Sequence, residues 1–140
     1  MSPVHELIEF HDSDLTDCVR TGANIELRIN AYVHRWEQLD GCWRGTGWVQ
    51  DLSIVVSDAH VDETMPRLPV SISDGRLRVG DNEHEIVPTQ FESGGPAALV
   101  LRFDSNHQVE VVGSTVQIHP IGPARYVEDL PPDFAPRDDL

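Results

Sequence analysis

A regular alternation of apolar and polar residues between Ala97 and His119 restricts the possible folds of this chain more than any other feature of the sequence does. Successive side chains of a β-strand point to opposite faces of its sheet. The segment from Ala97 to Phe103 and the later residues Val109 and Val111 therefore predict two strands with a common apolar face. A fold built around such a meander is all-β.

The first turn of this meander follows Phe103. A shift of one residue in register would mix apolar and polar side chains on both faces, so burial favours an odd-numbered loop. Such a loop sets Phe103 opposite Val109, with Asn106 or His107 in the left-handed conformation that it requires.

The second turn is Gly113-Ser114, a two-residue loop with glycine first. This pattern is typical of a type II′ hairpin, which would set Val111 opposite Val116. Both turns then predict the same buried face: Leu99, Leu101, Phe103, Val109, Val111, Val116 and Ile118.

Two longer segments, residues 24–34 and 48–57, also alternate in this way. Ten glycines and ten prolines, spread along the chain, are typical of many strands joined by turns. We expect an antiparallel β-sandwich or open barrel of about eight short strands. At most two short helical turns are expected, one from Ser2-Pro3 through Phe10, where an edge strand is the alternative, and one over residues 126–130. Residues 1–130 would form a single domain, and residues 131–140 an acidic, proline-rich tail.

The charge is the most unusual feature of the composition. The chain has 24 acidic and 10 basic residues, all of the latter arginine, for a formal net charge of −14. Nucleic acid and anionic membranes both need positive surface, so neither is an expected partner. A basic protein is an expected partner, although solubility alone also accounts for such a charge. With no apolar run of membrane-spanning length and no signal-peptide pattern, we expect a cytoplasmic protein.

Three tryptophans surround a glycine-containing stretch at residues 37–47, which we interpret as a loop. Tryptophan is enriched at binding hot spots, and loops can present it, although these rings could equally cap the core. We expect a binding surface formed by these rings and by an acidic connection: Trp36, Trp43, Trp48, Asp58, Asp62 and Glu63.

Two short clusters could instead hold a metal ion or serve an enzyme, because imidazole and carboxylate groups are good metal ligands. They are His11, Asp12 and Asp14, and Asp58, His60 and Asp62. Each also has a structural interpretation, the first as a turn before a strand and the second as a solvated acidic loop. No phosphate-binding glycine loop, paired Cys-x-x-Cys or nucleophile elbow is present, and we expect no catalytic residue and no cofactor.

The tetrad Phe10-His11-Asp12-Ser13, followed by a strand, a turn and a long strand, and the late segment Gly-Ser-Thr-Val-Gln-Ile resemble small uncharacterised bacterial all-β families. Some of these are similar to immunity proteins of polymorphic toxin systems. The resemblance implies an acidic, non-enzymatic protein that binds and blocks a toxin. The acidic tail has no counterpart in that pattern. Self-assembly through an exposed strand edge is a further hypothesis.

Overall fold

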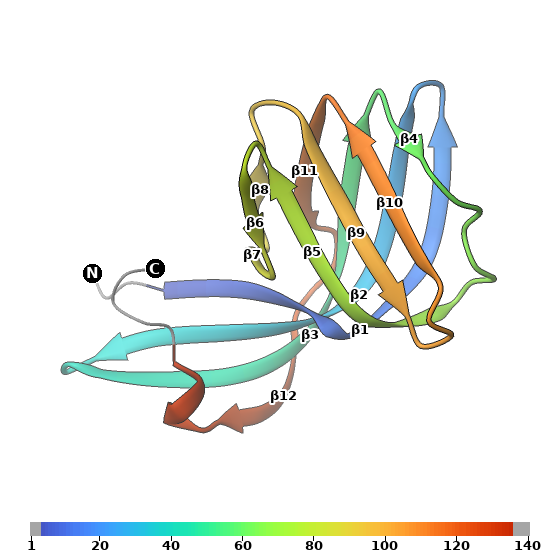
Figure 1. Ribbon diagram of the computed structural model, residues 1–140. Coiled ribbons are helices and arrows are strands. Elements are labelled where there is room, and N and C mark those ends of the chain that lie inside the picture. The colour runs from blue at the N-terminus through green and yellow to red at the C-terminus, as the bar shows by residue number, and fades with distance from the viewer. Residues whose placement is uncertain (1–3, 136–140) are drawn as a thin grey trace.

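The computed structural model describes residues 4–135, whose twelve strands form one open antiparallel sheet (Figure 1). The three longest strands follow one another along the chain, and the central path through the sheet runs β4-β10-β9-β5-β1-β2-β3-β11-β8. The all-β prediction is confirmed, whereas the expected eight short strands are not. The strands are β1 (Val4–Thr21), β2 (Asn24–Leu39), β3 (Cys42–Ser57), β4 (His60–Val61), β5 (Val70–Val79), β6 (Asn82–His84), β7 (Ile86–Pro88), β8 (Phe91–Glu92), β9 (Ala97–Phe103), β10 (Gln108–Gly113), β11 (Thr115–Pro120) and β12 (Arg125–Leu130).

The long strands β1, β2 and β3 run through two parts of the molecule, which we call the arm and the body (Figure 1). The arm comprises residues 4–9 of β1, 31–39 of β2 and 42–50 of β3, with β12 paired to β3 and β7 paired to β1. The body contains the other halves of these strands with β5, β9, β10 and β11. There the sheet curls so that β10 contacts β3 and β9 contacts β11.

The arm leaves the body at the Phe-His-Asp-Ser tetrad, residues 10–13. Between its pairs with Tyr32 and Asn30, β1 has these four residues where β2 has only Ala31. Asp12 takes the left-handed conformation there, with φ of 73°. Extra residues in one strand bend it and increase its twist. The tetrad is therefore the bulge that turns β1 from the arm into the body.

The core lies inside the curled body, and the predicted apolar face belongs to it. All seven residues of that face are buried, as are the inward-facing residues of β2 at positions 25, 27, 29, 31 and 33. The alternation of the sequence thus predicted the core correctly.

The turn between β9 and β10 confirms the odd-numbered loop but shifts its register by two residues. Phe103 hydrogen-bonds through its N–H to the carbonyl oxygen of His107 at 2.9 Å, and Val109 pairs with Leu101. Asn106 is in the left-handed conformation, as expected, with φ of 67°. Whether the loop has an odd or an even number of residues decides which face of the strands is buried. The expected and the observed loops are both odd, so the two registers bury the same side chains.

The Gly113-Ser114 hairpin is a wrong prediction. β10 pairs with β9 and β4, whereas β11 pairs with β3 and β8, so the chain crosses between separate positions in the sheet. The N–H of Ser114 donates to the carbonyl oxygen of Ser57 at 2.8 Å. β11 pairs with β3 over six residues, and this long-range pairing takes the place of a local hairpin between β10 and β11.

Two other local predictions differ from the structure, and the open alternative at the N-terminus is decided. Residues 37–47 form a hairpin with the turn Asp40-Gly41, both at positive φ, which is an Asp-Gly hairpin signal that the loop interpretation missed. Residues 126–130 belong to β12 and form no helical turn, because they pair with β3. Of the two alternatives for the N-terminal segment, the structure shows the strand, from Val4 onward, because it pairs with β2. In the tail, Pro132–Phe134 forms one 3-10 turn, and residues 136–140 lie outside the described part.

No helix within residues 4–135 has the length and apolar character needed to cross a membrane.

Candidate functional site

A recess of about 320 Å³ lies where the arm meets the body, and we call it the arm recess. This volume is at the small end of the range for ligand sites, so it suits one side chain or a small molecule. Its lining comes from β1, β2, β5, β7 and the connection between β6 and β7: Leu7, Ile8, Glu9, Phe10, His11, His34, Trp36, Asp74, Gly75, Glu85 and Ile86.

Aromatic and aliphatic side chains form the apolar wall of the recess. Trp36 is 1% exposed and lies directly over Gly45 of β3, whose missing side chain makes room for the ring. Gly75 of β5 makes room for Phe10 in the same way, since a Cβ there would lie 2.7 Å from the Phe10 ring. Ile86, 56% exposed, stands at the rim. Two glycines, one on β3 and one on β5, therefore allow two large rings to line the recess.

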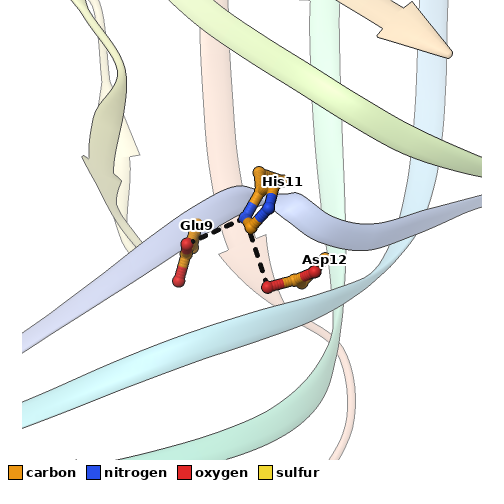
Figure 2. A group of neighbouring side chains, drawn as sticks. All are labelled: Glu9, His11 and Asp12. Atoms are coloured by element: carbon orange, nitrogen blue, oxygen red, sulfur yellow. Dashed lines mark hydrogen bonds and ion pairs between the residues drawn. The ribbon is translucent and has the colours of Figure 1, made fainter. Parts of the chain in front are cut away.

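Glu9 is the central polar group of the recess. Its carboxylate contacts Nε2 of His34 at 2.5 Å with one oxygen and Nδ1 of His11 at 3.0 Å with the other. Asp12 Oδ2 lies 3.2 Å from the same His11 nitrogen (Figure 2). The hydrogen bond from Glu9 is the main cause that raises the pKa of His11 above its ordinary value, with a smaller contribution from the charge of Asp12. Burial acts in the opposite direction.

Two further carboxylates, far from Glu9 in the sequence, lie at the rim of the recess. Asp74 of β5 accepts the N–H of Gly75 at 2.9 Å. Glu85 is exposed between β6 and β7. None of the described residues lining the recess is an arginine, and the chain has no lysine. The recess therefore combines an apolar wall with three carboxylates and two histidines.

Tyr32 extends the same face of the arm away from the recess. Its ring meets the His34 ring edge-on at a centroid distance of 5.3 Å, and its hydroxyl donates to Glu128 of β12 at 2.6 Å. Gly47 lies beneath the hydroxyl. Burial is the main cause that raises the pKa of Tyr32, and the hydrogen bond to the Glu128 carboxylate raises it further.

The structure changes the membership of the first metal hypothesis. Glu9, His11 and Asp12 offer ligand atoms within 4.8 Å of one another, and they are the one such group found within residues 4–135. Asp14 follows the bulge and pairs with Asn30 and Ser71, away from this group. The left-handed backbone at Asp12 brings its carboxylate back toward His11.

The candidate ligands of the second metal hypothesis, Asp58, His60 and Asp62, do not converge. Asp58 accepts the hydroxyl of Ser114 at 2.8 Å, and Asp62 accepts the N–H of Glu110 at 2.8 Å. His60 pairs with Val112 in the sheet. The two carboxylates thus hold the strand ends of the body together.

The predicted binding surface is divided among three places. Trp36 and Trp43 share one face of the arm, but Trp36 is buried and Trp43 lies near the tip, beside His5. Trp48 packs on the opposite face against Tyr126. The acidic residues Asp58, Asp62 and Glu63 belong to the far end of the body, around β4 (Figure 1).

Four residues of the recess escaped the analysis of the sequence: Glu9, His34, Asp74 and Glu85. Glu9 and His34 are ordinary polar positions of the alternating strands β1 and β2, and Asp74 lies within β5, so none of them belongs to a recognisable motif. The only sequence signal was the proximity of Glu9 to the His11-Asp12 pair. Their convergence follows from the pairing of β1 with β2, β5 and β7.

Comparison with known proteins finds no matching protein-family model, no matching curated protein and no matching solved structure.

Proposed function

We propose that this chain is a non-enzymatic, acidic binding domain whose partner is a basic protein. The arm recess carries the proposal, since it sets three carboxylates around an apolar wall in a chain of net charge −14. The sequence resemblance favours one form of this function, a cytoplasmic immunity protein that binds and blocks a toxin.

The whole-molecule charge and the recess would serve different steps of binding. A strongly negative surface attracts a basic protein over a distance and raises its association rate, an effect that salt screens. A small apolar recess then supplies the buried contact that such complexes need at their centre. Binding should therefore weaken with salt and depend on residues of the recess.

A capture experiment tests this function. The immobilised chain is exposed to lysate of its source cell and washed at low and then moderate salt. We expect one stoichiometric basic protein, released by salt and identified by mass spectrometry. The double variant Glu9→Gln/Glu85→Gln should lose it.

The matched control is Asp81→Asn/Glu92→Gln, which removes two exposed charges outside both the recess and the predicted tryptophan and β4 surface. It should retain the partner. Equal retention by both double variants would place binding elsewhere, as the predicted tryptophan and β4 surface requires. Recovery of acidic or neutral proteins only would contradict the proposed function.

A second candidate function is metal binding by Glu9, His11 and Asp12. One imidazole and two carboxylates suit a first-row divalent ion. Calorimetry with Zn²⁺, on protein carrying no histidine tag, should show one site that is lost in His11→Ala. Asp14→Asn should bind Zn²⁺ as the wild type does. Loss of Zn²⁺ binding in Asp14→Asn would instead support the ligand set expected from the sequence, His11, Asp12 and Asp14. Absence of heat and of any rise in Tm would contradict this candidate.

A further inference from the structure

We propose that the arm recess receives one arginine side chain of the basic partner. This inference deepens the proposed function and rests on it, because it names the chemical group that the recess recognises. It commits to a guanidinium group, as opposed to an ammonium group or a purely apolar side chain.

The size and shape of the recess favour a single side chain. A volume of about 320 Å³ is too small for a helix or a strand, yet large enough for a long side chain with its solvent. Leu7 and Ile86 lie across the pairing of β1 with β7 and offer aliphatic contact. The methylene stem of an arginine packs well on such a surface.

The polar groups favour a cation at the end of that stem. Glu9, Asp74 and Glu85 approach the recess from β1, β5 and the β6–β7 connection. Two or more carboxylates from different directions match the several N–H groups of a guanidinium, which can bind carboxylates in pairs. An anionic ligand would find no arginine among the described lining residues.

The histidines decide between arginine and lysine. Glu9 is already in contact with both His11 and His34, so part of its charge is occupied. A strongly hydrated ammonium group loses much on entering such a half-apolar site, whereas a guanidinium is weakly hydrated and stacks on aromatic rings. His34, whose side chain is 19% exposed, provides such a ring at this position.

A titration with capped tripeptides, followed by ¹H–¹⁵N NMR of the ¹⁵N-labelled full chain, tests the assignment. The probes are acetyl-Gly-Arg-Gly-amide, its lysine counterpart and its citrulline counterpart, which keeps the shape of arginine without the charge. We expect saturable shifts at Gly75, Ile86 and the Trp36 indole with the arginine peptide. Lysine and citrulline peptides should bind about tenfold more weakly, the loss of one charge-assisted hydrogen bond.

Variants locate the binding within the recess. Glu85→Gln, at an exposed position, should weaken the arginine peptide by about tenfold, and Glu92→Gln, at another exposed position outside the recess lining, should leave it unchanged. Wild-type titrations do not depend on the folding of any variant, so the comparison among peptides stands by itself.

Three results would overturn the inference: no saturable shift at the recess, equal binding of arginine and citrulline peptides, or equal binding of arginine and lysine peptides. Each leaves the proposed function to the capture experiment. A basic partner held without arginine binding would refute only the inference. Arginine binding in the recess with no basic partner captured would refute the function and keep only the recognition of a guanidinium group by the recess.

Discussion

Ser13 shows at the scale of one residue how the bend in β1 is stabilised. Its hydroxyl donates to the carbonyl oxygen of Glu9 at 2.6 Å and accepts the N–H of Tyr32 at 3.0 Å. The side chain is 1% exposed. Within the bulge this hydroxyl replaces ladder hydrogen bonds that the three extra residues of β1 interrupt, and it thereby holds Glu9 beside the recess.

Replacing Ser13 with alanine should destabilise the protein by about 1–3 kcal/mol, because two backbone groups would lose a buried partner. Urea unfolding monitored by circular dichroism measures this change. Ser105→Ala, in the exposed β9–β10 turn, is the control and should change the free energy of unfolding by less than about 0.5 kcal/mol. If Ser13→Ala changed the free energy of unfolding no more than the control does, water would be hydrogen-bonding the Glu9 carbonyl oxygen and the Tyr32 N–H in place of the hydroxyl.

His11 responds to its carboxylate neighbours in a way that titration can measure. Since Glu9 is the main cause of its raised pKa, Glu9→Gln should lower that pKa toward 6.5. Asp12→Asn should lower it less. NMR titration of the imidazole resonances tests both, and equal effects would contradict the ranking.

The sign of the linked stability change follows from the raised pKa. The folded chain binds the His11 proton more tightly than the unfolded chain does. The contribution to stability is therefore complete below the pKa of the unfolded chain and is lost as pH rises through the folded value. In Glu9→Gln the folded and unfolded pKa values of His11 should lie closer together, so less stability should be lost between them.

The glycines of β3 show at the scale of an element why the arm can be three long strands carrying large rings on one face. Gly45 lies opposite Trp36, and Gly47 lies opposite His34 and under the Tyr32 hydroxyl. Any side chain at these two positions would occupy the space of the rings. Small residues on β3 thus determine where the aromatic residues of β2 can pack.

Gly45→Ala should cost about 1–3 kcal/mol, because the new Cβ collides with the buried Trp36 ring and the ring must move. The Trp36 indole resonance should shift at the same time. Gly95→Ala is the matched control, since a Cβ there meets nothing within 4 Å. Thermal unfolding of both variants gives the comparison, and an unchanged Tm for Gly45→Ala would show that the arm relaxes freely.

The net charge acts at the scale of the whole molecule. An excess of 14 negative charges on 140 residues repels itself in the folded state, and salt screens that repulsion over about 10 Å at 0.1 M. Raising NaCl from about 20 to 200 mM at pH 7 should therefore raise Tm by about 2–5 °C, in a size range where 1 kcal/mol corresponds to a few degrees.

The control for this prediction is the same pair of scans near the isoelectric point of about 4.6, where the net charge is close to zero. The increase in Tm should be much smaller there. A fall in Tm with salt at pH 7 would show that attractive ion pairs, such as those of Arg35 with Glu37 and Arg78 with Glu110, outweigh the repulsion.

The sequence by itself determined the fold class and most of the core. Alternation reports on which face of a strand is buried, and that information is local, so residues 25–33 of β2 and the face of β9, β10 and β11 were predicted correctly. The turn at Asn106 was local as well.

The tertiary structure alone decided which strands pair and where charged groups meet. Ser114 lies in a crossover, and Trp36, Trp48 and Glu63 lie apart, because long-range pairing overrides short signals. Glu9, Asp74 and Glu85 come together only through the pairing of β1 with β5 and β7. Burial has a local periodicity that sequence displays, whereas the convergence of distant side chains depends on register and on a bulge, which periodicity does not encode.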